Sequence, residues 1–182
     1  LRPKQWIKNV FLFFPLFFSW LFLEGHLLFE VLIVAFLFSL FSWATYILND
    51  IHDRESDAHH PKKKYRPIAS GIIPAPFAFF IFALLFSGIL LLVFFYFPIR
   101  LFSLFLLYFI YSILYSFLLK EQFLLDVFSL SIGFIIRILI GAAVISVEPS
   151  LWILSMTFFV SLWFGFSKRY QELSFGTSTR KV

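Results

Sequence analysis

Residues 27–57 read LLFEVLIVAFLFSLFSWATYILNDIHDRESD, an apolar run that ends abruptly in a group of acids. The apolar part, residues 27–48, contains Glu30 as its single charged residue. It is long enough to cross the hydrocarbon core of a bilayer as a helix, which takes about 20 residues. The acids follow without a linker, so this helix is expected to carry Asp50 and Asp53 to a membrane surface. The stretch therefore predicts a helical membrane protein with a polar site at one end of the bundle.

The rest of the chain repeats this pattern of long apolar runs separated by polar turns. Hydrophobic residues make up 61% of the 182 residues and charged residues 14%. A typical soluble domain has roughly 45–50% and ~25%, so we exclude a soluble fold. The runs lack the two-residue alternation of membrane barrels. We predict an all-α, polytopic transmembrane helical bundle that forms a single domain over residues 1–182. Its six expected helices span residues 6–23, 27–48, 74–97, 101–119, 123–147 and 151–167.

The basic residues predict the orientation of the bundle. If the N-terminus is cytoplasmic, all but two of the 15 Lys and Arg residues lie at cytoplasmic ends of the spans. The exceptions are Arg100, on the outer side, and Arg137, inside the fifth span. This bias follows the positive-inside rule, and it explains the net charge of +5 without a nucleic-acid partner. We expect a multi-pass protein of the plasma or bacterial inner membrane, with residues 49–73 and 168–182 in the cytoplasm.

The acids after the second span have the spacing of one helical face. If the helix continues into them, Asp50, Asp53 and Asp57 stand three and four residues apart and repel one another. A hard cation relieves that repulsion, and Mg²⁺ is typically held by one or two carboxylates, waters and substrate phosphates. We predict that Asp50 and Asp53, with the amide oxygen of Asn49, hold Mg²⁺ against a diphosphate. On spacing alone, the alternative is a solvated loop whose acids balance nearby bases.

Two groups of basic residues are open to more than one interpretation. Lys64 and Arg66 satisfy the positive-inside rule, yet their residue types also suit phosphate oxygens, Arg through a bidentate fork. Arg137 lies inside a span, where a charge costs at least about 2.5–3.5 kcal/mol and is treated as functional by default. Binding of a lipid phosphate and pairing with a neighbouring helix are the two interpretations of Arg137.

The polar segments resemble those of a known family. Asn49-Asp50-x-x-Asp53-x-x-x-Asp57, followed by RPIASG at residues 66–71, resembles the first aspartate-rich motif of the UbiA superfamily of membrane prenyltransferases. The motif lies where that superfamily has it, at the cytoplasmic end of the second helix. The resemblance implies a Mg²⁺–diphosphate site in which Asp50, Asp53 and Asp57 are catalytic.

A closer resemblance within the superfamily is to the decaprenyl-phosphate phosphoribosyltransferase family. It rests on RPKQWIKN at residues 2–9, on parts of residues 120–142, and on KRYQEL at residues 168–173. It implies transfer of a phosphoribosyl group from phosphoribosyl diphosphate to a polyprenyl phosphate, with Mg²⁺ as cofactor and a role in cell wall biosynthesis. The superfamily fold has about nine transmembrane helices, so we expect this chain, which begins at Leu1, to be the N-terminal part of a longer bundle.

The segment after the sixth span departs from the wider superfamily. Where prenyltransferases have a second aspartate-rich motif, this chain has Lys168, Arg169 and Glu172. The resemblance implies that Lys168 and Arg169 hold the 5-phosphate of the sugar donor, while Tyr170 and Glu172 orient its hydroxyl groups. The alternative is a basic helix end that obeys the positive-inside rule. The remaining substrate-binding residues expected from the matching segments are Lys8 and Lys120.

Two other functions stay open from the sequence. An ordinary UbiA prenyltransferase uses the same metal site to ionise an allylic diphosphate, which an aromatic or lipid acceptor then attacks. A cation channel or transporter is the non-enzymatic alternative. Its pathway needs ionisable residues at depth, whereas acids within the spans are confined to Glu30 and Asp126, near helix ends. The lipid chain length and the oligomeric state are not predicted.

Overall fold

The computed structural model describes residues 3–59, 61, 63–119 and 122–174, which form helices and turns without a strand. The predicted fold class, an all-α bundle of membrane-spanning helices, is confirmed. The elements in chain order are η1 (Pro3–Phe13), α1 (Phe14–Phe18), η2 (Leu21–Leu23), α2 (Gly25–His52), α3 (Arg54–Ala58), η3 (Lys63–Tyr65), α4 (Ala75–Tyr96), α5 (Ile99–Leu114), η4 (Tyr115–Leu119), α6 (Phe123–Val144) and α7 (Leu151–Ser174).

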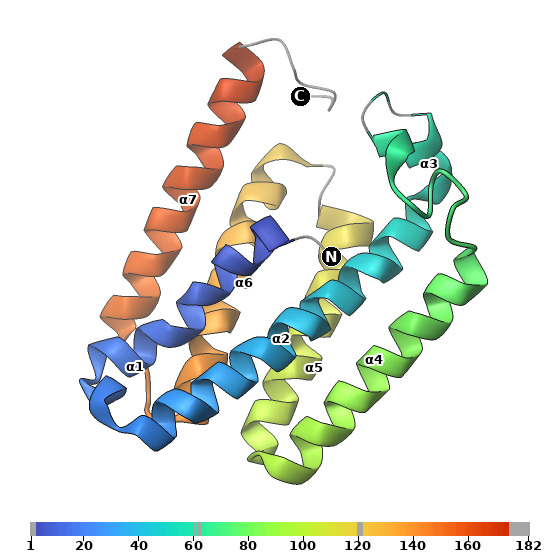
Figure 1. Ribbon diagram of the computed structural model, residues 1–182. Coiled ribbons are helices and arrows are strands. Elements are labelled where there is room, and N and C mark those ends of the chain that lie inside the picture. The colour runs from blue at the N-terminus through green and yellow to red at the C-terminus, as the bar shows by residue number, and fades with distance from the viewer. Residues whose placement is uncertain (1–2, 60, 62, 120–121, 175–182) are drawn as a thin grey trace.

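Five helical segments of the described chain are long and apolar enough to cross a membrane: α2, α4, α5 with η4, α6 and α7. They match five of the six predicted spans. Successive long helices run in opposite directions, so the end of α2, the start of α6 and the end of α7 point the same way (Figure 1). We call this the polar end, marked by residues 49–74. The other is the distal end, marked by residues 145–150.

The remaining predicted span, residues 6–23, is divided. It consists of the 3₁₀-helix η1, the short α1 and a turn before η2. Pro15 lies in the first turn of α1, where its missing N–H leaves no hydrogen bond broken. In the middle of a continuous α-helix it would remove a bond and clash with the preceding turn. At about 2.0 Å per residue in η1 and about 1.5 Å in α1, the segment measures about 30 Å, which still matches the hydrocarbon layer.

Helix α2 is longer than predicted, and this extension carries the acidic motif. It continues to His52, so Asn49 and Asp50 lie on the helix itself. Asp53 ends α2 and precedes α3. The backbone N–H of Asp53 donates to the carbonyl of Asn49 (2.9 Å), and that of Asp57 donates to the carbonyl of Asp53 (2.8 Å). These bonds carry the helical course across the break, so the acids keep their predicted spacing.

The core lies between α2, α5 and α6, and aromatic rings fill its centre. Phe38 and Phe41 of α2 pack edge-on or tilted against Phe105 and Tyr108 of α5, with ring centroids 4.6–6.4 Å apart. Such ring pairs add to the stabilisation from buried area. Helix α6 is central, because 67% of its span is buried inside the bundle, against 17% of the span of α7.

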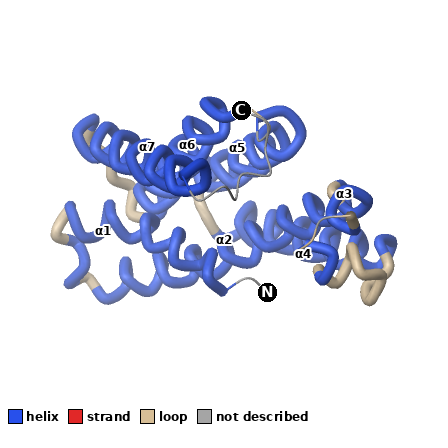
Figure 2. The backbone as a smooth tube through the Cα atoms, turned by 90° about the horizontal axis from the view of Figure 1, so that it is seen from above, coloured by secondary structure: helices blue, strands red, loops and turns tan. Residues whose placement is uncertain are grey.

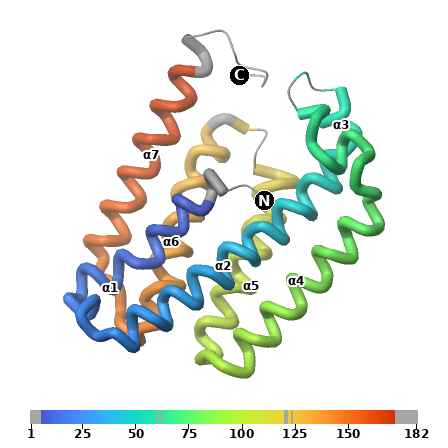
Figure 3. Tube along the Cα trace, in the orientation of Figure 1, coloured from blue at the N-terminus to red at the C-terminus, as the bar shows by residue number. Residues whose placement is uncertain are grey.

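The helices form two rows that spread apart toward the polar end. From above, α5, α6 and α7 lie in one row and α1, α2 and α4 in the other (Figure 2). Helix α2 contacts α6 but leans away from it toward the polar end, as the chain trace also shows (Figure 3). We call this arrangement the wedge. Its narrow part is closed by the aromatic core, and its wide part faces the polar end.

An ion pair ties two elements together at the distal end. Arg100 at the start of α5 donates from Nη1 to Glu148 Oε1 (2.5 Å) and from Nη2 to Oε2 (3.0 Å). The hydrogen bond from Arg100, together with its charge, lowers the pKa of the Glu148 carboxyl group. Because both groups are exposed, the pair adds little to stability. It does fix the α6–α7 turn beside α5.

Close packing of η1 on α6 requires a glycine at position 141. A Cβ atom there would collide with the backbone carbonyl of Leu12, which is fully buried. A backbone atom cannot rotate out of the way as a side chain can. Gly88 of α4, in contrast, faces open space.

We therefore expect Gly141→Ala to destabilise the protein by about 1–3 kcal/mol, the usual effect of overpacking. Gly88→Ala is the matched control. It should be neutral or slightly stabilising, because alanine favours helix over glycine. Thermal unfolding of both variants in detergent measures the difference. Equal midpoints for the two variants would show that η1 does not pack closely on α6.

Candidate functional site

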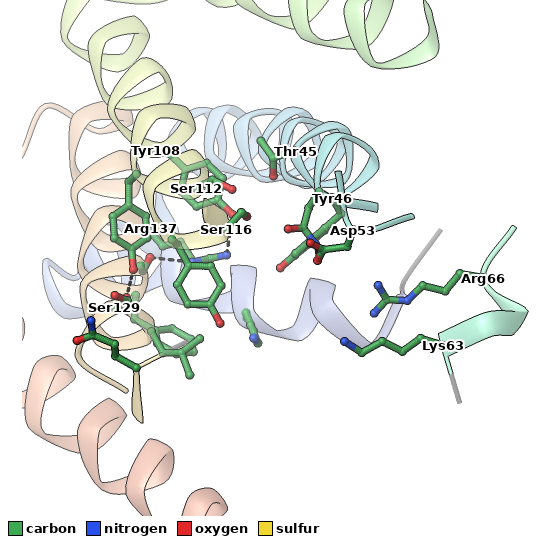
Figure 4. Close-up of a pocket in the computed structure, with 18 of the residues that line it drawn as sticks. Thr45, Tyr46, Asp53, Lys63, Arg66, Tyr108, Ser112, Ser116, Ser129 and Arg137 are labelled. Atoms are coloured by element: carbon green, nitrogen blue, oxygen red, sulfur yellow. Dashed lines mark hydrogen bonds between the residues drawn. The ribbon is translucent and has the colours of Figure 1, made fainter. Parts of the chain in front are cut away.

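A cavity of about 840 Å³ lies between the two rows of helices. It extends from Lys63 and Arg66 at the polar end to Arg137 inside the bundle (Figure 4). Its lining residues are Lys8, Thr45, Tyr46, Asn49, Asp53, Ser56, Lys63, Arg66, Tyr108, Tyr111, Ser112, Tyr115, Ser116, Gln122, Ser129, Leu130, Gly133, Phe134 and Arg137. The cavity therefore occupies the wide part of the wedge.

Each of three helices contributes one face to the cavity wall. The contributing residues on each helix stand three or four apart, the spacing of one helical face. Between α5 and α6 the wall includes η4, a π-helical turn, and such turns are frequent at functional sites. The three faces are Thr45, Asn49 and Asp53 on α2 and at its end; Tyr108, Tyr111, Ser112, Tyr115 and Ser116 on α5 and η4; and Ser129, Gly133 and Arg137 on α6.

Arg66 joins two of the three predicted catalytic acids. Its guanidinium donates to Asp50 Oδ1 (3.0 Å) and to Asp57 Oδ2 (2.5 Å). Lys63 Nζ lies 3.5 Å from Asp57 Oδ1. Asp57 is only 2% exposed, so these two cations stabilise its charge where water cannot. The contacts fasten the loop after α3 to the end of α2 and hold Asp50 and Asp57 in place.

Asp53 is the acid that lines the cavity, and Asn49 lines it beside Asp53. The Asn49 side-chain amide donates to Asp53 Oδ2 at 3.3 Å. No cluster of three His, Asp or Glu side chains that could hold a metal ion occurs among the described residues. The oxygen donors of Asn49, Asp50 and Asp53 nevertheless suit Mg²⁺, which takes one or two carboxylates and leaves its other positions to water and phosphate. The residues fit a metal shared with a substrate.

Arg137 lies at the inner end of the cavity and is 6% exposed. Its Nε donates to Asn9 Oδ1 (3.0 Å), its Nη1 to the Gly133 carbonyl (2.7 Å), and its Nη2 to the Tyr108 hydroxyl (3.3 Å). Arg137 thus has partners on η1, α5 and α6, all of them uncharged. Its predicted contact with a lipid phosphate stays a prediction. The aromatic rings with centroids 5.3–5.7 Å from its guanidinium carbon are Phe38, Tyr108 and Phe134.

Arg169 is paired with an acid beside the cavity. It donates to Asp126 of α6, while Tyr115 donates its hydroxyl proton to the other oxygen of Asp126 at 2.7 Å. Asp126 is 1% exposed. The pair fastens the end of α7 to α6 and links both to the cavity wall through Tyr115. The predicted contact between Arg169 and a 5-phosphate would require this pair to open.

The other predicted substrate-binding residues are scattered. Lys8 lines the cavity from η1. Lys64 lies 5.2 Å from the ring centroid of Tyr65, away from the lining. Lys168 and Tyr170 are exposed on the last turns of α7. Lys120 and the side chain of Glu172 lie outside the described residues.

The hydroxyl-bearing wall formed by α5 and η4 was not predicted from the sequence. Its tyrosines and serines, from Tyr108 to Ser116, recur at helical spacing in an otherwise apolar membrane segment. A polar stripe on such a helix marks a face turned away from lipid. The spacing of these residues in the sequence could therefore have predicted the wall. Asn9 was also missed, because an isolated Asn near a span end has no distinguishing pattern.

The profile of the UbiA prenyltransferase family matches residues 5–171, which include the acidic motif and every described helix that lines the cavity. The chain belongs to the UbiA prenyltransferase family. The resemblance predicted from the polar motifs is confirmed.

Curated relatives of this UbiA-family chain include proteins with a stated activity. It is 33% identical to the decaprenyl-phosphate phosphoribosyltransferase of Mycolicibacterium smegmatis, over 98% of the chain and 57% of that protein. The protein of the same name from Corynebacterium glutamicum is 33% identical over 95% of the chain and 53% of its own length. The nodulation protein NoeC of Azorhizobium caulinodans is 34% identical over 95% and 56%. The chain therefore spans a little over half the length of these relatives.

The Asp126–Arg169 pair yields a stability prediction. We expect Asp126→Asn to destabilise the protein by about 3–5 kcal/mol, because it removes the buried carboxylate that Arg169 contacts. The double variant Asp126→Asn/Arg169→Gln should recover part of this loss. Glu148→Gln, which breaks the exposed pair at the distal end, is the control and should have little effect. Thermal unfolding in detergent compares the three, and an Asp126→Asn midpoint equal to that of Glu148→Gln would contradict the prediction.

Proposed function

We propose that this chain carries the donor site of a transferase that moves a phosphoribosyl group from phosphoribosyl diphosphate to a polyprenyl phosphate. The observation that carries the proposal is the chemistry of the cavity wall. In the described lining, Leu130 and Phe134 are the purely aliphatic or phenyl side chains, whereas nine residues bear hydroxyl groups. These nine are Thr45, Tyr46, Ser56, Tyr108, Tyr111, Ser112, Tyr115, Ser116 and Ser129.

The hydroxyl groups favour a sugar donor over a prenyl donor. A ribosyl group presents hydroxyls that exchange hydrogen bonds with tyrosine and serine side chains. The hydrocarbon chain of a prenyl diphosphate offers no such hydrogen bonds to this wall. The names of the relatives from M. smegmatis and C. glutamicum support the same donor and a polyprenyl phosphate acceptor.

The charged residues at the polar end of the cavity suit the binding of the donor's diphosphate. Lys63 and Arg66 lie at the polar end of the cavity, beside Asn49 and Asp53. We place the diphosphate of the donor there. Positive side chains aimed at the leaving oxygens stabilise the charge that develops as diphosphate departs.

The remaining steps need positioning more than proton transfer. The hydroxyl wall holds the ribose so that its anomeric carbon faces the acceptor, and such orientation alone lowers a barrier substantially. The acceptor is a phosphate oxygen that is already anionic, so no strong general base is required. Mg²⁺ bound by Asp50, Asp53 and Asn49 would supply Lewis-acid neutralisation of the leaving diphosphate.

We further propose that the polar end faces the cytoplasm. Among the described residues, the exposed cations Arg54 and Lys64 lie at this end, while Arg100 lies at the distal end. The excess of Lys and Arg on cytoplasmic loops supports this orientation.

Cysteine labelling tests the orientation, since the chain has no Cys of its own. Ser70 is exposed at the polar end and Ser150 is exposed at the distal end. We expect Ser150→Cys to react with a membrane-impermeant maleimide in intact cells, and Ser70→Cys to react only after the cells are opened. Labelling in the reverse order would overturn the orientation.

A transfer assay tests the function. Membranes that contain the complete polypeptide carrying this chain should transfer label from phosphoribosyl diphosphate to a short-chain polyprenyl phosphate in the presence of Mg²⁺. We expect Asp53→Asn to remove nearly all turnover, because Asp53 is the acid that lines the cavity. Glu55→Gln, an exposed acid two residues further on, is the matched control and should keep it.

The same assay separates the alternatives. Transfer from a labelled prenyl diphosphate, with none from the ribosyl donor, would favour an ordinary UbiA prenyltransferase. Wild-type rates for Asp53→Asn at saturating Mg²⁺ would remove Asp53 from the site.

A further inference from the structure

We propose that Lys8 and Arg137, which line the same cavity, form a second anion-binding site that binds a phosphate monoester. Both side chains line the cavity, Lys8 from η1 and Arg137 from α6. In the close-up, Arg137 lies on the opposite side of the cavity from Lys63 and Arg66 (Figure 4). Cationic side chains thus line the cavity at both ends. A diphosphate at the polar end would explain the role of Lys63 and Arg66, but not that of Arg137.

The charge of Arg137 is held by neutral groups. Its hydrogen-bond partners in the described chain are the amide oxygen of Asn9, the carbonyl of Gly133 and the hydroxyl of Tyr108. These bonds use three of the five N–H groups of a guanidinium. A charge within a membrane bundle is costly, and it normally pairs with an opposite charge or with backbone carbonyls. Within the described lining, the single acid is Asp53, which lies toward Lys63 and Arg66 (Figure 4).

A chain of hydrogen bonds fixes the guanidinium in advance. The Asn9 amide donates to Ser39 Oγ (2.8 Å), and Ser39 Oγ donates to the Ala35 carbonyl (2.7 Å). The Asn9 oxygen is therefore turned toward Arg137. Asn9 and Ser39 are both buried. Donors that are already oriented bind an anion without reorganisation, which is the property that makes such sites strong.

Lys8 distinguishes a binding site from a purely structural arginine. Hydrogen bonds and aromatic rings alone would explain an Arg137 that only holds helices together. They do not explain a second cation on the same cavity, where two like charges are unfavourable. No salt bridge of Lys8 is found within the described part of the chain. A phosphate between the two cations relieves their repulsion and accepts charge-assisted hydrogen bonds from both.

Two ligands carry the required group. The phosphoribosyl donor has a 5-phosphate besides its diphosphate, and the polyprenyl acceptor has a terminal monophosphate. The identity of these ligands rests on the proposed function, whereas the anion site itself does not. If the site binds the 5-phosphate of the donor, it takes over the role predicted for Lys168 and Arg169.

Binding of three probes to the purified complete polypeptide tests the inference: ribose 5-phosphate, farnesyl monophosphate and inorganic pyrophosphate. We expect Lys8→Gln to weaken one of the two monoesters by about ten- to a hundredfold, the effect of one charge-assisted hydrogen bond. Pyrophosphate binding should change far less. Lys8→Arg should restore the monoester, and Arg54→Gln, at an exposed position of α3, should match the wild type.

The pattern of binding across the three probes distinguishes the possible outcomes. Selective loss of ribose 5-phosphate assigns the site to the donor, and selective loss of farnesyl monophosphate assigns it to the acceptor. Unchanged binding of both monoesters, or equal weakening of all three probes, would overturn the inference. If Lys8→Gln weakens a monoester selectively but the transfer assay shows no phosphoribosyl transfer, the anion site stands and the proposed function fails.

Discussion

A positive charge inside a membrane needs polar groups of the protein around it. Arg137 therefore constrains how the helices of the bundle pack. Asn9 of η1, Tyr108 of α5 and the Gly133 carbonyl of α6 supply its hydrogen bonds, while Phe38 of α2 offers a ring face. Lipid cannot replace these partners. Four of the elements that line the cavity therefore meet at one side chain, and Phe38 and Tyr108 also belong to the aromatic core.

The membrane layer also explains what could be predicted from the sequence. Apolar length alone located α2, α4, α5, α6 and α7, because a helix must satisfy its own backbone in lipid. The first span was different, since the chain winds as a 3₁₀-helix before α1 begins and Pro15 lies in the first turn of α1. Hydropathy measures the length of an apolar segment and not the pitch of its backbone.

The candidate site was only partly predictable. Spacing predicted Asp50, Asp53 and Asp57 on one face, and backbone hydrogen bonds continue the helical spacing across the break at Asp53. It could not reveal that Arg66, nine residues beyond Asp57, would join two of these acids. That contact depends on the fold of the loop between α3 and α4. Similarly, the pairing of Asp126 with Arg169 joins residues 43 apart, and it depends on how α7 packs against α6.

The shape of the wedge bears on the side from which a soluble ligand reaches the cavity. Its wide part opens at the end that carries the acidic motif, and its narrow part ends in the rings of Phe38 and Phe105 and in the tight crossing of η1 over Gly141. Within the described part of the chain, the aromatic core therefore lies between the cavity and the distal end. A water-soluble ligand would reach the cavity from the polar end, where the acidic motif lies.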